Sequence, residues 1–94
     1  MLPEEFEIIK NDFKEIKSGV IRLAASKDLI YHNRLTSAQV ADLLLLFSFG
    51  KERFNLAKFA FAYIMDPRNY NKVTKNFIFN GTSQELWYYL GNIS

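Results

Sequence analysis

The 94-residue sequence has no cysteine, a single histidine and only four glycines. The absence of cysteine excludes disulfides, thiolate zinc sites, iron–sulfur clusters and cysteine nucleophiles. Because His32 is the only histidine, no site within this chain can use two imidazole ligands. The four glycines are scattered and never form the glycine-rich loop that binds phosphate groups. The composition therefore argues against most metal, redox and nucleotide chemistry, and we expect no cofactor.

Long hydrophobic runs are also missing. The longest apolar stretches, 43–47 and 60–65, are far shorter than the ~20 residues that span a bilayer. The first residues are acidic where a secretory signal would be basic. We therefore expect a soluble chain without a transmembrane segment, either cytoplasmic or a domain of a secreted protein. Its length and its 49% hydrophobic content suit one helical domain, 1–94, as a module of a longer protein.

Charge is low in total but unevenly distributed. The formal net charge is +2, which is small for a nucleic-acid-binding domain. Residues 1–17 hold five acidic and three basic residues, whereas residues 50–94 hold six basic and three acidic residues. An acidic beginning and a basic second half indicate either complementary faces within the domain or an anionic partner.

The hydrophobic spacing predicts an all-α fold of about six short helices. Apolar residues recur every three or four positions, which is typical of helices with one buried face, and strict alternation is confined to 77–79. Thr36-Ser37-Ala38-Gln39 has the pattern of a capping box, and Asp66-Pro67 has that of an N-cap followed by a proline in the first turn. The expected helices span 3–17, 20–31, 37–47, 51–65, 67–76 and 82–91.

Two of these helices carry definite expectations about packing. The helix at 51–65 is apolar nearly all round, which predicts a central helix covered by its neighbours. The helix at 20–31 is expected to turn one face inward, formed by Leu23, Ala24, Lys27, Ile30 and Tyr31. In the third and fifth helices the expected inward residues are Val40, Leu43, Leu44, Phe47, Tyr70, Val73 and Phe77.

A weak internal repeat accompanies the helices. Phe47-Ser48-Phe49-Gly50 precedes one expected helix, and Phe77-Ile78-Phe79-Asn80-Gly81 precedes another. Leu23-Ala24 also lies 33 residues before Leu56-Ala57. This spacing favours two related helical units packed around the helix at 51–65.

Several short motifs together resemble a known family. They are Leu35-Thr36-Ser37-Ala38-Gln39-Val40, Leu46-Phe47-Ser48-Phe49-Gly50, Arg53-Phe54-x-Leu56-Ala57-Lys58, Asp66-x-x-Asn69-Tyr70-x-Lys72-Val73, Phe77-x-Phe79 and Glu85-Leu86-x-x-Tyr89-Leu90. Their order and spacing are similar to the domain of unknown function 4476 family, from about residue 6 to residue 90. The resemblance implies a short helical module of bacterial and animal proteins, often secreted ones, with no catalytic residues to transfer. Gly50 departs from the pattern, since an acidic residue is common there.

Catalysis finds little support in the residues themselves. His32 is the residue type best suited to general acid–base work, but no nucleophile motif accompanies it, and an exposed structural histidine is the better interpretation. The carboxylates that cluster in the first helix are best explained as its solvated face: Glu4, Glu5, Glu7, Asp12 and Glu15. We expect no enzyme and no metal site.

Two candidate partner surfaces remain. Arg68, Lys72 and Lys75 fall at i, i+4 and i+7 and so share one helix face, which is either an ordinary solvated face or a site for an anionic partner. Trp87, Tyr88 and Tyr89 are consecutive, so at least one is exposed and either covers the edge of the core or contacts a partner. The sequons at Asn80 and Asn92 matter only in a secreted eukaryotic protein, and a turn is the better interpretation of Asn80-Gly81.

The sequence thus predicts a non-enzymatic protein-interaction or structural module whose partner is another protein. The alternative is an accessory domain that binds nucleic acid or a membrane surface through its basic face, and the low net charge makes nucleic acid the weaker candidate.

Overall fold

The computed structural model describes residues 1–48 and 50–70 of the chain, and it contains only helices and connections there. The α-helices are α1 (Pro3–Lys14), α2 (Gly19–His32), α3 (Ser37–Leu44) and α4 (Gly50–Phe61), followed by the 3-10 helix η1 (Pro67–Asn69). No strand occurs in these two stretches, so the prediction of an all-α fold is confirmed for them. None of the helices in the described part is long and apolar enough to cross a membrane.

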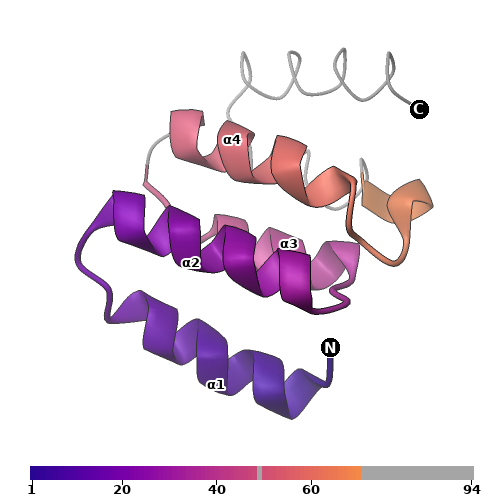
Figure 1. Cartoon of the computed structure of the whole chain (residues 1–94), viewed down its shortest axis with the longest axis horizontal. Coiled ribbons are helices and arrows are strands. Elements are labelled where there is room, and N and C mark those ends of the chain that lie inside the picture. The colour runs from indigo at the N-terminus through magenta and orange to yellow at the C-terminus, as the bar shows by residue number, and fades with distance from the viewer. Residues whose placement is uncertain (49, 71–94) are drawn as a thin grey trace.

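The four α-helices pack in layers. Figure 1 shows α2 lying between α1 and α4, with α3 behind α2. α2 packs against both α1 and α4, and α3 also packs against α4. The core between them draws on every α-helix and on the segment after α4. Its buried members are Phe6, Leu29, Ile30, Leu35, Val40, Leu43, Leu44, Phe47, Leu56, Ala57, Ala60 and Tyr70.

Local sequence explains where the helices begin. Pro3 stands in the first turn of α1, where its missing N–H costs nothing, and two glutamates follow it. The Ser18 hydroxyl caps α2 by accepting a hydrogen bond from the Ile21 amide at 3.2 Å. At α3 the predicted capping box is confirmed, because Thr36 and Gln39 each accept a hydrogen bond from the other's backbone amide.

The inward faces were predicted well for α3 and less well for α2. All four inward residues of the third helix, together with Tyr70, are buried, whereas Val73 and Phe77 lie outside the described residues. On α2, Ile30 is buried, but Ala24 and Tyr31 are exposed. The expectation that Tyr31 faces the core is therefore wrong. α2 ends at His32, the next residue, so no further turn of the helix follows this side chain.

The predicted central helix at 51–65 needs correction. α4 ends at Phe61, and it buries only Leu56, Ala57 and Ala60. Beyond it the Tyr63 amide donates to Ala60 O in a tighter turn, and the Met65 amide donates to Leu35 O at 2.9 Å instead of continuing the helix. Among the described helices, α4 packs against α2 and α3 while α2 packs against α1 and α4, so the central position of the helix at 51–65 stays a prediction.

The predicted number of about six helices is not matched in the part of the chain that the structure describes. Four α-helices are present, and the helix expected at 67–76 begins as the 3-10 helix η1. The helix expected at 82–91 lies outside the described residues. The second half of the proposed repeat, at 77–81, lies there as well, so the division into two related units stays a prediction.

Asp66 plays a different role from the predicted N-cap. Its side chain makes no capping hydrogen bond to η1. Instead its Oδ1 accepts hydrogen bonds from the amide of Ser37 at 2.7 Å and from the Ser37 hydroxyl at 2.9 Å, which places the carboxylate at the beginning of α3. The Asn69 amide group donates to Oδ2 at 3.2 Å. The carboxylate thus joins the segment after α4 to the N-terminus of α3, where a negative charge is favourable.

This contact gives a pH-dependent prediction. Burial alone raises the pKa of Asp66, but the hydrogen bonds from Ser37 and Asn69 together outweigh it and hold that pKa below its ordinary value of 3.8. A carboxyl whose pKa is lowered on folding stabilises the protein above the unfolded value and loses that contribution as the pH falls through the folded value. We expect Asp66→Asn to lower the free energy of unfolding by about 1 kcal/mol at neutral pH, with the difference shrinking below pH 3.8. Urea unfolding at several pH values measures this, and a difference that stays constant with pH would contradict it.

Ser26 is a buried polar residue of α2. Its side chain is fully buried in α2, and its hydroxyl has no hydrogen-bond partner among residues 1–48 and 50–70. An unpaired buried hydroxyl is costly, and serine is a weaker helix former than alanine. We expect Ser26→Ala to raise the free energy of unfolding by about 0.5–1 kcal/mol in urea denaturation. The matched control is Ser18→Ala, which removes a hydroxyl that does accept a hydrogen bond and should destabilise the fold.

Candidate partner groove

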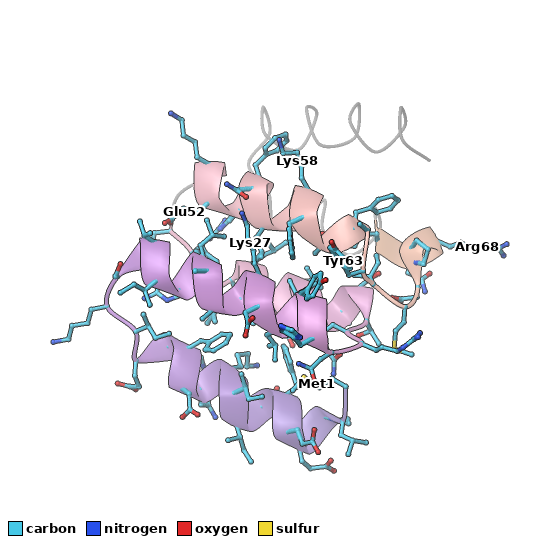
Figure 2. The ribbon with its side chains drawn as sticks, viewed as in Figure 1. Met1, Lys27, Glu52, Lys58, Tyr63 and Arg68 are labelled. Atoms are coloured by element: carbon cyan, nitrogen blue, oxygen red, sulfur yellow. The ribbon has the colours of Figure 1, made fainter. Side chains whose placement is uncertain are left out.

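The surfaces predicted from sequence fall mostly outside the described residues. Trp87, Tyr88, Tyr89, Lys72 and Lys75 all lie there, and so do the two sequons. Of the predicted basic face, the structure places only Arg68. It lies in η1, it is exposed, and Figure 2 shows its side chain extending away from the ribbon.

His32 lies at the exposed end of α2. Its Nε2 is 3.3 Å from Asp28 Oδ1 one turn earlier, and both side chains are largely exposed, at 64% and 75%. An exposed pair of this kind contributes little to stability. The His32 ring also contacts the ring of Tyr31 edge-on, with the centroids 5.0 Å apart. In the described ranges no three histidine or acidic side chains come together as metal ligands.

A groove of about 440 Å³ opens where α2 and α4 end. One side is formed by residues 30–34 and the other by residues 62–65. Within the part of the chain that the structure describes, the lining consists of Ile30, Tyr31, His32, Asn33, Arg34, Ala62, Tyr63, Ile64 and Met65. We call it the tyrosine groove, because an exposed tyrosine lies on each side.

Hydrogen bonds to backbone carbonyls hold the two sides of the tyrosine groove in place. The Met65 amide donates to Leu35 O at 2.9 Å, which ties the segment after α4 to the segment after α2. The Asn33 side chain donates to Leu29 O at 3.0 Å and caps the end of α2. The amino group of Met1 donates to Arg34 O. The groove is therefore part of the folded framework rather than a gap between free loops.

Aromatic contacts continue from the groove along the surface between α2 and α4. The rings of Tyr31 and Tyr63 meet at a centroid distance of 5.5 Å and an angle of 67°. Tyr63 also packs against Phe59, with the centroids 5.1 Å apart, and the Lys27 ammonium lies 5.5 Å from the centre of the Phe59 ring. Figure 2 shows Tyr63 and Lys27 on the same side of the molecule, over the line where α2 meets α4.

Three large side chains that line the groove are well exposed. Tyr31 is 59% exposed, Tyr63 40% and Met65 54%. Single exposed apolar residues are common on protein surfaces, but three that line one groove form a patch. Tyrosine offers a large apolar ring with a polar tip, which suits a surface that is hydrated in the free protein and buried when a partner binds.

The tyrosine groove was not foreseen from the sequence. Tyr31 was assigned to the core, and Tyr63 and Met65 were assigned to the covered central helix. Pro67 disfavours helical conformation only at Asp66, so it does not mark the end of α4 at Phe61, and we find no local sequence signal that does. Once α4 ends at Phe61, the side chains that follow no longer have a helical face to share.

A second hollow, of about 380 Å³, lies at the beginning of α2. One of its charged groups, Arg22, already has partners within the fold. The Glu52 carboxylate lies against Gly19, and Arg22 is bound to backbone carbonyls. An added Cβ at Gly19 would meet the end of the flexible Glu52 side chain, which would have to move aside. We regard this hollow as part of the structural framework.

Comparison with known proteins gives one match. The model of a family described as domain of unknown function (DUF4476) matches residues 1–90. No curated protein and no solved structure matches the chain significantly.

Proposed function

The chain belongs to the DUF4476 family of domains of unknown function, and we propose that it is a non-enzymatic protein-interaction module whose partner binds at the tyrosine groove. The observation that carries this proposal is the exposure of Tyr31, Tyr63 and Met65 around one groove with fixed sides. We also propose that the domain is one module of a longer protein.

The composition of the groove supports a protein as its partner. Tyrosine, methionine and arginine are enriched in protein interfaces, and the tyrosine groove presents all three. Because its backbone is already held by hydrogen bonds, little ordering is needed when a partner binds. A surface with these properties favours an interface over a solvated loop region.

Removal of the two tyrosines tests the proposal. We expect Tyr31→Ala combined with Tyr63→Ala to weaken partner binding by roughly 30-fold or more, because such central aromatic residues typically contribute 2 kcal/mol or more. The free energy of unfolding should fall by about 1 kcal/mol or less per substitution, since both side chains are partly exposed. The assay is affinity capture from the native source, with wild-type and variant domains side by side and the folding of each checked by circular dichroism.

The control is Ile8→Ala, which removes an apolar side chain that is 64% exposed on α1, away from the groove. A partner retained by wild type and Ile8→Ala but lost from the double tyrosine variant supports the proposal. A partner that the double variant retains at full strength contradicts it. Trp87→Ala and Tyr88→Ala test the other predicted partner surface in the same assay.

The alternative function is binding of an anionic ligand, a nucleic acid or a membrane surface, through Arg68, Lys72 and Lys75. Its support is the exposure of Arg68, whose guanidinium has no partner among the described residues. Changing these three residues to glutamate should then abolish binding, and the wild-type affinity should fall steeply between low and moderate salt. Binding at the tyrosine groove should survive that change in salt.

A further inference from the structure

We propose that the tyrosine groove selects an acidic segment of its partner, with a partner carboxylate on Arg34 and an apolar partner side chain against Tyr31 and Tyr63. This inference rests on the proposed function, since it names the chemistry of the protein segment that the groove binds. Three features of the groove carry it: its charge, its fixed geometry and the division of its lining into a cationic and an aromatic part.

The charge of the groove points to an anionic group. Arg34 is exposed and supplies the permanent positive charge, and no carboxylate stands among the nine lining residues. Asp28 and Asp66 belong to the neighbouring turns, but Asp28 already contacts His32, and Asp66 accepts hydrogen bonds from Ser37 and Asn69. In the described part of the chain the Arg34 guanidinium therefore has no hydrogen bond or ion pair.

The backbone that carries Arg34 is held on both sides. Its own carbonyl accepts a hydrogen bond from the Met1 amino group, and the next carbonyl, of Leu35, accepts one from the Met65 amide. Thr36 follows as the N-cap of α3. A guanidinium on a fixed backbone can meet a carboxylate with two parallel hydrogen bonds, which gives direction as well as attraction.

The remainder of the lining suits an apolar side chain. Tyr31, Tyr63 and Met65 supply ring and thioether surface, and a volume of about 440 Å³ can hold more than one side chain. A partner segment in which acidic and apolar residues alternate or stand side by side would contact both Arg34 and the aromatic lining at once. A purely acidic segment would leave the aromatic surface uncovered, and a purely apolar one would leave Arg34 unpaired.

Selection from a random peptide display library against the intact chain tests this inference. We expect the enriched peptides to contain aspartate or glutamate beside a large apolar residue, and the synthetic peptides to shift NMR amide signals within 30–34 and 62–65. Replacing the selected acid by its amide should weaken binding by about tenfold. Arg34→Ala should weaken binding similarly, and Arg34→Glu should weaken it further.

Lys14→Glu is the matched control, because it makes the same change of charge at an exposed position on α1. It should leave peptide affinity within about twofold of wild type. Peptides that bind the groove but contain no acidic residue would overturn the inference and leave the proposed function standing. An absence of any peptide bound at 30–34 and 62–65, or displacement of the peptide by an oligonucleotide at equal concentration, would overturn both.

Discussion

Replacing Tyr70 by alanine is expected to lower the free energy of unfolding by about 3–5 kcal/mol. Tyr70 is fully buried, and its ring packs against Phe61 with the centroids 5.6 Å apart. Its hydroxyl donates a hydrogen bond to Ala57 O at 2.6 Å, which ties the segment after η1 to the middle of α4. Truncation removes the ring from the core and leaves a cavity that its neighbours fill only in part. Urea denaturation followed by circular dichroism measures the loss.

Tyr70→Phe separates the ring from the hydroxyl. It keeps the packing and removes the hydrogen bond to Ala57, so we expect a loss of only about 1 kcal/mol. Burial raises the pKa of Tyr70 above its ordinary value of 10.0. A neutral group with a raised pKa stabilises the fold below the unfolded value and loses that contribution as the pH rises. Above pH 10.0 the free energy of unfolding of the wild type should therefore fall by more than that of Tyr70→Phe. Equal losses for the alanine and phenylalanine variants would contradict this account.

Arg22→Met is expected to lower the free energy of unfolding by about 2–4 kcal/mol. The Arg22 guanidinium donates hydrogen bonds to Phe13 O at 3.2 Å, to Leu46 O at 3.2 Å and to Ile16 O. It also lies over the Phe47 ring, with Cζ 5.8 Å from the ring centre. One side chain of α2 thus binds carbonyls in the last turn of α1, directly after α1 and after α3. Methionine keeps much of the length and apolar stem but leaves these carbonyls without their donor.

Arg22→Lys provides the comparison for this prediction. Lysine keeps the charge but cannot reach three separate carbonyls with a planar fork, so we expect most of the loss to remain. Both variants are measured by urea denaturation at neutral pH. If Arg22→Met were as stable as wild type, the three hydrogen bonds would contribute nothing, and the connection between the ends of α1 and α3 would have to depend on apolar packing alone.

The sequence predicted best those features whose signals are local. The capping box at Thr36 and Gln39 and the buried face of α3 depend on residues three or four positions apart, and both are confirmed. The role of Arg22 could not be predicted, because its carbonyl partners lie six, nine and 24 residues away along the chain. Asp66 illustrates the same limit. Asp66 does precede a helical turn, as its sequence pattern predicts, but its carboxylate binds the N-terminus of α3, 29 residues earlier in the chain.

The candidate site depends on contacts between residues that are far apart in the sequence. The tyrosine groove exists because α2 and α4 end side by side, and Met65 then pairs with Leu35, 30 positions earlier in the chain. Apolar periodicity assigns Tyr31 and Tyr63 to buried faces, since it registers residue type and not where a helix stops. Helix ends are therefore where sequence and structure differ in this protein, and the exposed aromatic residues lie at those ends.

Site-specific photocrosslinking from the groove tests the central claim most directly. A photoreactive benzoylphenylalanine placed at position 63 in the native source should form a covalent adduct with one partner protein on irradiation. The same residue at position 8, on the exposed face of α1, should form no such adduct. Arg34→Glu combined with the probe at position 63 should reduce the yield. If the probe at 63 captured no protein, or if positions 63 and 8 captured the same proteins equally, the tyrosine groove would not be the partner surface of this domain.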